Sequence, residues 1–242
     1  METALHRWLL VQSPLLGPAS WRRTAQVLIN HGQRVLTQRV PMTTTAHQDH
    51  VGPWIEQYLQ MEKPADDLPM VAVGHSAACP RMPLLVHELR RVGWNIQYLI
   101  CVDGRFPDGR AFTDAPTFGP MLNAMVRPDD YLPPWPRWWG SLISGLVVDP
   151  GAREEVMSEA VPIPRSWFDQ ACPVPDLPPE VRQGYVAFGG SYLESAAEAE
   201  SNGWFTVRID GDHLHQVVNP LEVATTLMSM VACMGAGEHP SR

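Results

Sequence analysis

The segment 71–78 places a serine where nucleophilic chemistry is favoured. It reads Val-Ala-Val-Gly-His-Ser-Ala-Ala, so Ser76 follows Gly74 and lies between an apolar run and an expected helix. Small residues at such a point permit a turn sharp enough to expose the serine hydroxyl, which is called a nucleophile elbow. Ala78 stands where a second glycine is common. We predict Ser76 as a catalytic nucleophile; the plainer alternative is a serine at an ordinary strand-to-helix turn.

Two histidines follow the last apolar run of the chain. The loop after residues 205–209 reads Asp-Gly-Asp-His-Leu-His, with His213 at its apex and His215 nearer the final helix. The carboxyl ends of parallel strands gather at one edge of a sheet, so a histidine there can act as general base for a serine. We prefer His213 as the base and expect His215 to pack or to lie at the rim. Because no third ligand at a diagnostic spacing accompanies them, we expect no metal site.

A triad also needs an acid that orients the imidazole, and two carboxylates are candidates. Asp103 ends the apolar run 96–102, which follows the helix after the serine. The dipeptide Asp103-Gly104 is also a turn signal in its own right. The more common position follows the next strand, where segment 189–194 has no aspartate and offers Glu194. We predict Asp103 as the acid and keep Glu194 as the alternative.

The elements that must position these residues alternate between apolar runs and amphipathic patterns. This alternation predicts an α/β protein with a doubly wound, mostly parallel sheet and right-handed helical crossovers. The expected strands span residues 8–11, 35–40, 70–73, 96–102, 185–188 and 205–209. The expected helices span residues 20–31, 49–61, 77–91, 193–201 and 220–233.

Residues 112–179 differ in character from the rest of the chain. Prolines cluster there, four tryptophans appear, and strand periodicity is lost. The segment is too apolar for a disordered linker and too irregular for a sheet, so we predict a helical lid, with helices near 136–146 and 151–160. Trp135, Trp138 and Trp139 are candidate substrate-binding residues, although they could instead be packing anchors on the sheet edge. The core would comprise residues 1–111 and 180–242.

These motifs together resemble the α/β-hydrolase superfamily over nearly the whole chain. The resemblance rests on the apolar first strand with its loop at residues 13–18, the Gly-His-Ser elbow and the Gly-Asp-His ending. An acid at Asp103 is similar to the thioesterase branch, which includes release domains of polyketide and peptide synthases. The resemblance implies that Ser76 attacks an acyl carbonyl, that His213 takes and returns its proton, and that Asp103 holds the imidazole. No cofactor is implied.

The resemblance also implies an oxyanion hole made from backbone donors. One donor would be the N–H of Ala77, directly after the nucleophile. The second would come from the first loop, but Ser13-Pro14 stands where the family has His-Gly, and Pro14 has no N–H. We therefore expect Leu15 to supply the loop donor.

Three functions follow from these residues. The first is a serine esterase or thioesterase acting on a hydrophobic acyl substrate, free or bound to a carrier, for example in secondary metabolism. The altered oxyanion loop keeps open a cyclase or lyase on the same fold, in which the histidine and the acid do acid–base work. The third is a silent binding protein, against which the intact triad argues.

Composition excludes several classes of protein. The 242 residues suit one α/β domain, and the net charge of −8 without a Lys/Arg cluster argues against a nucleic-acid partner. The four cysteines are scattered, with no Cys-x-x-Cys pair that would indicate disulfides or zinc. The apolar stretch 8–16 is interrupted by Gln12 and Ser13, and no other segment approaches a membrane span. We expect a soluble cytoplasmic protein; its oligomeric state stays open.

Overall fold

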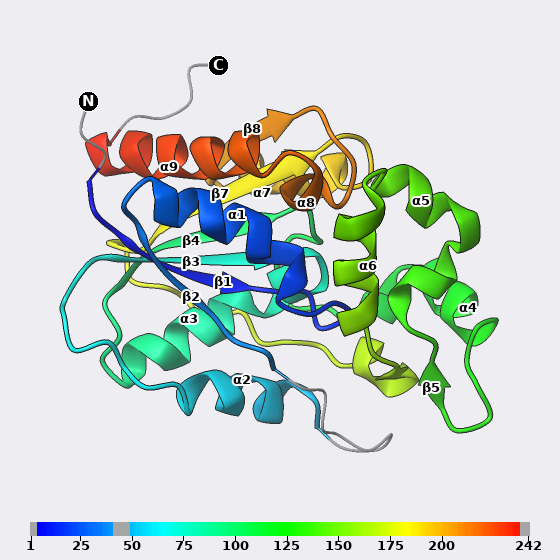
Figure 1. The fold of residues 1–242 in the computed structure, drawn as a ribbon. Helices are drawn as coiled ribbons and strands as arrows, with labels where there is room; N and C mark the ends of the chain where they lie inside the picture. Colours follow the sequence, from blue (N-terminus) through cyan, green and yellow to red (C-terminus); the bar gives the residue numbers. More distant parts are fainter. Residues whose placement is uncertain (1–3, 41–48, 238–242) are drawn as a thin grey trace.

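The computed structural model describes residues 4–40 and 49–237. A six-stranded sheet forms its centre, in the order β2-β1-β3-β4-β7-β8, and every neighbouring pair is parallel (Figure 1). The predicted doubly wound α/β fold is therefore confirmed, although the second strand ends earlier than expected. The strands are β1 (Arg7–Val11), β2 (Arg34–Thr37), β3 (Met70–His75), β4 (Ile96–Val102), β7 (Arg182–Phe188) and β8 (Phe205–Ile209).

The register of the sheet brings the ends of its central strands to one edge. Gly74 near the end of β3 pairs with Val11 of β1 and with Cys101 of β4. The neighbouring strand continues this alignment, because Val102 at the end of β4 pairs with Val186 of β7. The loops that leave β1, β3, β4 and β8 therefore start from the same edge, as expected for a doubly wound sheet.

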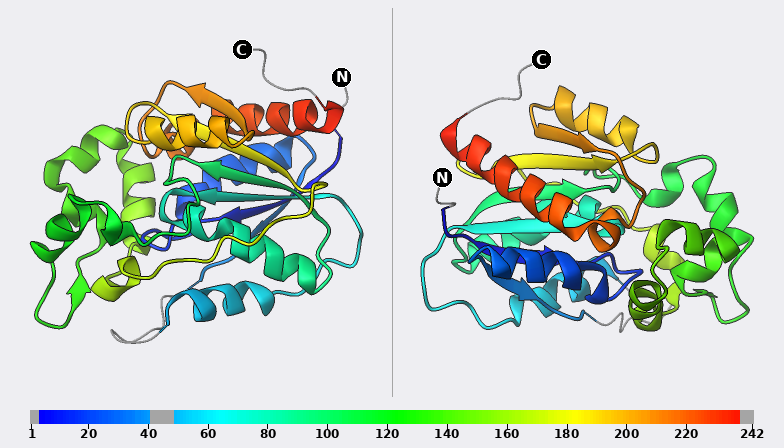
Figure 2. Two further views of the ribbon diagram at one scale, coloured as in Figure 1. Left: turned by 180° about the vertical axis from the view of Figure 1, so that it is seen from behind. Right: turned by 45° about the horizontal axis from the view of Figure 1, so that its top comes forward.

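Helices cover both faces of this sheet (Figures 1 and 2). On one face, α1 (Ala19–Asn30) and α9 (Pro220–Ala236) pack their apolar side chains against β1, β3, β4 and β7. On the other face lie α2 (Val51–Leu59), α3 (Met82–Arg91) and α7 (Leu193–Ser201). The helix expected over 77–91 is divided: a 3-10 turn, η1 (Ser76–Arg81), precedes α3, because Pro80 lacks the N–H that an α-helix would use.

Residues 112–168 lie beyond the carboxyl ends of the strands, and residues 169–179 run back along the sheet to the start of β7 (Figures 1 and 2). The expectation that this insertion contains no sheet is wrong, since Leu132 and Ile163, both fully buried, pair in a short antiparallel ladder. Burial of these two side chains in the core of the insertion outweighs the irregular sequence around them. The elements are η2 (Phe112–Asp114), α4 (Phe118–Asn123), β5 (Tyr131–Leu132), η3 (Trp135–Trp138), η4 (Gly140–Leu142), α5 (Ile143–Leu146), α6 (Pro150–Glu159), β6 (Ile163–Pro164) and η5 (Arg165–Phe168).

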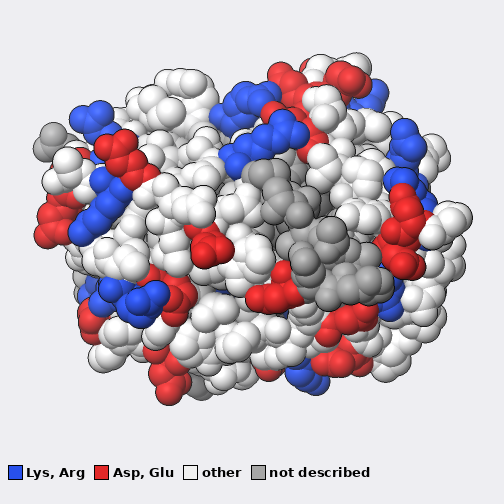
Figure 3. Space-filling model, turned by 90° about the horizontal axis from the view of Figure 1, so that it is seen from below, with Lys and Arg blue, Asp and Glu red and all other residues white. Residues whose placement is uncertain are grey.

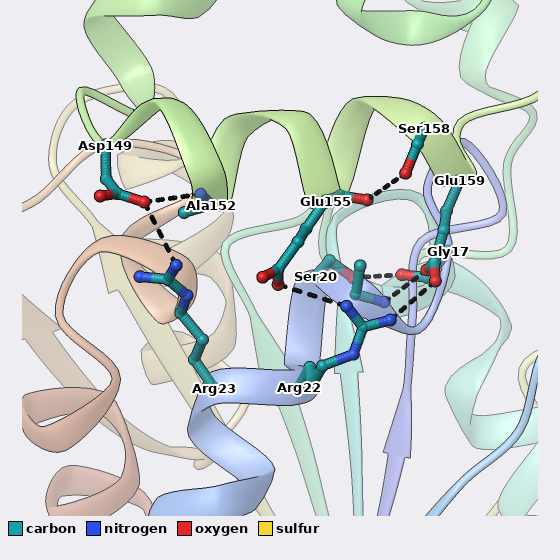
Figure 4. A network of polar contacts seen from close by, with 10 residues as sticks. Gly17, Ser20, Arg22, Arg23, Asp149, Ala152, Glu155, Ser158 and Glu159 are labelled. Carbon is teal, nitrogen blue, oxygen red and sulfur yellow. Dashed lines mark hydrogen bonds and ion pairs between the residues drawn. The ribbon is translucent and has the colours of Figure 1, made fainter.

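Helix α6 is bound to the start of α1 by a network of carboxylates and arginines (Figure 4). The Glu159 carboxylate accepts the N–H of Ala19 at 2.6 Å and lies against Gly17. Helix α1 has no side-chain cap and no acidic residue in its first turn, so Glu159 supplies the negative charge that a helix N-terminus favours. The ion pairs are Arg22 with Glu155 (3.2 Å), Arg22 with Glu159 (2.8 Å) and Arg23 with Asp149 (3.2 Å).

Charged side chains of both signs share the molecular surface. On the face shown in Figure 3, Lys and Arg side chains are interspersed with Asp and Glu. Such mixing leaves no single field of positive charge on this face. Within the described ranges, none of the helices has both the length and the apolarity needed to cross a bilayer.

Candidate active site

Ser76 stands at a strained turn between β3 and η1. Its φ is 57°, a left-handed conformation that is uncommon for a residue with a Cβ and is typical of a nucleophile elbow. Gly74 is required by packing, because a Cβ there would come closer than 3.0 Å to the side chain of Met82. Ala78 is fully buried and is accommodated where a glycine is more common. The sequence pattern therefore folds into the expected sharp turn.

A second strained turn lies beside the first and contains the predicted acid. Asp103 follows β4 with a φ of 42°, and its N–H donates to the carbonyl of Val186 at 2.8 Å. A Cβ on Gly104 would come closer than 3.0 Å to the carbonyl oxygen of Ser76. The hydroxyl of Tyr185 donates to the Gly104 carbonyl and holds the turn from the other side. The sequence indicated an Asp-Gly turn here but not this requirement for glycine.

The structure brings Ser76, His213 and Asp103 into one hydrogen-bonded series. His213 Nδ1 lies 2.6 Å from Asp103 Oδ2, and His213 Nε2 lies 2.8 Å from Ser76 Oγ. A carboxylate only accepts hydrogen bonds, so Nδ1 carries the proton and Nε2 accepts from the serine hydroxyl. Asp103 is fully buried, and its other oxygen accepts the N–H of Phe188 at 2.8 Å. This is the arrangement that activates a serine.

The imidazole of His213 is held by its neighbours as well as by Asp103. His75 is fully buried and its Nε2 lies 2.9 Å from the His213 carbonyl. Burial lowers the pKa of His75 well below its ordinary value, and the nearby His213 lowers it further, so His75 stays neutral and donates from Nε2. The rings of Trp135 and Tyr192 lie 5.7 Å and 5.5 Å from the His213 ring. These contacts fix the position of the base.

The two alternative residues from the sequence lie outside this series. Glu194 is exposed in the first turn of α7, and it is Asp103 that hydrogen-bonds the imidazole. His215 begins the short helix α8 (His215–Val218), and its Nε2 lies 2.7 Å from the Glu222 carboxylate. Its ring also contacts Phe188, with centroids 5.6 Å apart, so His215 is a packing residue.

Ser76 and His213 line a cavity of about 750 Å³ that lies beneath the insertion. The three tryptophans singled out from the sequence, Trp135, Trp138 and Trp139, all line it. A volume of this size and an aromatic wall suit an organic ligand with a large apolar part. Further apolar lining comes from Phe112, Phe118, Met121, Leu142, Leu146 and Phe168. Charged groups on the lining are Arg105, Asp108, Arg110, Asp114, Glu194, Glu198 and Asp212.

The fourth tryptophan, Trp167, has a different role. It is fully buried, and the guanidinium of Arg81 lies 3.5 Å from its ring centroid and donates to its carbonyl at 3.2 Å. Burial lowers the pKa of Arg81 to about 10. This cation–π contact joins η1, which begins at the nucleophile, to the insertion.

The two residues expected to supply oxyanion donors both lie at this cavity, but the N–H of Leu15 has a partner of its own. Ala77 and Leu15 both line it next to Ser76. The N–H of Leu15, however, is directed at the hydroxyl of Ser13 at 3.4 Å, and the loop is closed by a hydrogen bond from Leu16 N to the Ser13 carbonyl at 2.9 Å. The N–H of Leu15 is therefore partly engaged within the loop and is not fully free to contact an oxyanion.

The hydrogen-bonded side chains of Asp103, His213 and Ser76 form the chemical centre of the site in the described part of the chain. No group of three or more His, Cys, Asp or Glu residues there has the arrangement of a metal site. What the arrangement can do is nucleophilic acyl chemistry at Ser76.

Solved structures of similar fold cover nearly the whole chain. An extracellular α/β-hydrolase from a Paenibacillus species is 16% identical, with a TM-score of 0.67, over 93% of this chain and 98% of that one. Tomato methylketone synthase I, complexed with 2-tridecanone, is 15% identical (TM-score 0.70; 95% and 98% covered). Polyneuridine aldehyde esterase is 17% identical (TM-score 0.66; 94% and 99% covered).

No family model matches the sequence, and no curated protein matches it. The structural likeness is therefore found at low identity, where a shared fold is compatible with different reactions. Together with the parallel sheet, the elbow after β3 and the loops at the sheet edge, it shows that the chain has the α/β-hydrolase fold.

Proposed function

We propose that the protein is a serine hydrolase that cleaves esters or thioesters of a hydrophobic acyl group. The observation that carries this proposal is the series Asp103–His213–Ser76, which ends at a strained, cavity-facing serine. Strain of this kind is retained where it serves a function, because it costs about 1–3 kcal/mol per residue. A binding protein would have no use for both the strain and the oriented imidazole.

The geometry implies a two-step acyl transfer. Ser76 Oγ forms a bond to the acyl carbon while His213 Nε2 takes its proton, and the buried Asp103 carboxylate stabilises the resulting imidazolium. The carbonyl electron pair moves to the oxygen, and the proton on Nε2 then passes to the leaving alkoxide or thiolate. A water molecule repeats the sequence on the acyl-enzyme and releases the acid.

The insertion supplies the substrate preference in this proposal. Its tryptophans and phenylalanines line the cavity that Ser76 faces, so an apolar acyl chain or ring gains burial there at about 25 cal/mol per Å². Residues 112–179 would act as the lid that excludes water during acylation. The similarity of the acid position to thioesterases makes carrier-bound acyl groups part of the substrate range to be tested.

Turnover of model substrates tests the proposal. We expect p-nitrophenyl esters and acyl thioesters of increasing chain length to be hydrolysed, with kcat/KM rising with the length of the apolar chain. The Ser76→Ala variant should lose this activity, whereas Ser191→Ala, which changes another serine on the cavity lining, should retain it. Equal turnover by Ser76→Ala and the wild type would contradict the proposal.

A cyclase or lyase reaction in the same cavity is the second candidate. The observation that favours it is the loop after β1, where Pro14 has no N–H and Leu15 is directed at Ser13. A similar structure whose name denotes a synthase, tomato methylketone synthase I, supports the view that this fold accepts more than hydrolysis. Covalent labelling of Ser76 without turnover of any ester or thioester would favour this alternative.

A further inference from the structure

The loop after β1 (residues 12–18) lies between the nucleophile elbow and the insertion. Leu15 and Leu16 of this loop are buried in an apolar cluster that also contains Ala77, the residue after the nucleophile. Most of the other side chains in this cluster come from the insertion, for example Trp135 and Val156. The position of the loop therefore depends on how the insertion packs as well as on the sheet.

A carboxylate of the insertion fixes the end of this loop (Figure 4). Oε2 of Glu159 accepts the N–H of Ala19 at 2.6 Å, and its Oε1 accepts from Arg22 at 2.8 Å. Gly17 packs directly on the same side chain, because a Cβ at position 17 would come closer than 3.0 Å to Cβ and Oε2 of Glu159. The Gly17 carbonyl in turn accepts the N–H and the hydroxyl of Ser20, at 3.1 Å and 2.8 Å. Residue 17 is thus held between Glu159 and the first turn of α1.

The expected loop donor of the oxyanion hole stands two residues before Gly17. Leu15 lines the cavity together with Ser76 and Ala77. Its N–H lies 3.4 Å from the Ser13 hydroxyl, which is longer than the usual N–H···O distance of about 2.7–3.2 Å. Because this contact is long and weak, an oxyanion can take over the N–H, provided that the loop is already in the right place.

We propose that Glu159 is a positioning residue that holds the loop after β1 where the N–H of Leu15 can contact the developing oxyanion. It acts through the backbone of Gly17 and Ala19 and does not itself touch the substrate. A donor that is in place before the reaction stabilises the new negative charge without a cost of reorganisation, so the support of the loop contributes to the rate. This inference rests on the proposed acyl transfer at Ser76.

The Glu159→Ala variant tests this role because it removes the support of the loop and leaves the residues at the cavity unchanged. We expect kcat for p-nitrophenyl ester hydrolysis to fall by about 10- to 100-fold, since a displacement of about 1 Å can cost 10². KM should change by less than about threefold. The matched control is Glu155→Ala. Glu155 also pairs with Arg22, at 3.2 Å, but the contacts with Gly17 and Ala19 belong to Glu159, so this control should keep the wild-type kcat.

A conservative variant separates the position of the loop from the charge of the carboxylate. Glu159→Gln keeps a side-chain oxygen that can accept the N–H of Ala19 and loses the negative charge that pairs with Arg22. We expect its kcat to stay within about threefold of the wild type. A loss as large as that in Glu159→Ala would contradict positioning through the hydrogen bond to Ala19.

A further readout separates this role from support of the fold alone. An aryl boronic acid forms a tetrahedral adduct on the serine and so mimics the oxyanion, whereas the product acid does not. Glu159→Ala should weaken boronic acid inhibition by about the factor lost in kcat and leave product inhibition unchanged. Unchanged kcat and boronic acid affinity in this variant would overturn the inference alone. Absence of Ser76-dependent turnover in the wild type would overturn both it and the proposed function.

Discussion

Gly104 lies very close to the carbonyl oxygen of Ser76. A Cβ at position 104 would be less than 3.0 Å from that oxygen, a separation that Cβ atoms essentially never adopt. The turn that contains the nucleophile and the turn that contains the acid are therefore packed directly against each other. Both Ser76 and Asp103 have positive φ angles, at 57° and 42°. Each strained turn holds the other in place, and the position of the acid relative to the nucleophile depends on the absence of a side chain at 104.

The first prediction concerns this contact. Gly104→Ala should displace the elbow, because the new methyl group meets backbone rather than the flexible end of a side chain. We expect kcat to fall by at least about 10², since a displacement of about 1 Å can cost that much. Steady-state ester hydrolysis measures the effect, and thermal unfolding shows whether the fold survives.

The control for this change is Gly119→Ala in the insertion. A Cβ there would meet no atom closer than 3.7 Å, which is an ordinary contact. This variant should keep the wild-type kcat. Full activity in Gly104→Ala would show that the two turns are not coupled.

The second prediction decides between the two candidate acids. Asp103→Asn leaves the shape of the site intact but no longer favours a proton on Nδ1 of His213, so kcat should fall by roughly 10⁴. Glu194→Gln, by contrast, changes an exposed carboxylate on α7 and should lower kcat by less than about threefold. A larger loss in the Glu194 variant would reverse the assignment of the acid.

Much of the site could be predicted because each residue of the series follows a recognisable apolar strand, either directly or after a short loop. Ser76, Asp103 and His213 follow β3, β4 and β8, and parallel strands deliver such positions to a common edge. Local patterns are enough for this, since the period of the apolar residues fixes the strands. The doubly wound fold follows from the same patterns.

The remaining features depend on contacts between distant segments, which local patterns do not report. Glu159 caps α1 from the insertion, and the ring of Tyr192, from the loop after β7, lies 5.5 Å from the ring of His213. The ladder between β5 and β6 joins two-residue strands, too short to show a period. The need for glycine at 104 also arises only once the two turns are packed together.

The third prediction concerns the pH dependence of stability. Burial holds the pKa of His75 below its unfolded value of 6.5, and it also lowers those of His6 and His50. The unfolded chain then binds more protons than the folded protein below pH 6.5, so the free energy of unfolding falls as pH falls through that value and is retained above it.

Urea unfolding at about pH 7.5 and about pH 5.5 measures this loss. His75→Gln removes one titrating group while keeping a side-chain N–H, so its loss of stability between the two conditions should be smaller than that of the wild type. The difference can reach about 1.4 kcal/mol per pH unit for one proton. Identical pH slopes for the two proteins would contradict a depressed pKa at His75.

The fourth prediction concerns the network between α6 and α1. Glu159 is 17% exposed and both caps Ala19 and pairs with Arg22, whereas Glu155 is 42% exposed and only pairs with Arg22. Glu159→Ala should lower the free energy of unfolding by about 1–2 kcal/mol, and Glu155→Ala by less than about 1 kcal/mol. Chemical denaturation measures both values. A cost for Glu155→Ala equal to that for Glu159→Ala would show that the helix cap adds nothing to the ion pair.

The most direct test of the central claim is the intact mass of the protein after treatment with a fluorophosphonate, which reacts with activated serines. The account predicts one covalent adduct on the wild type, located at Ser76, and none on Ser76→Ala. It also predicts slower labelling of Asp103→Asn, since the imidazole is then wrongly oriented. An unlabelled wild type, or an adduct that persists in Ser76→Ala, would contradict the assignment of Ser76 as the nucleophile.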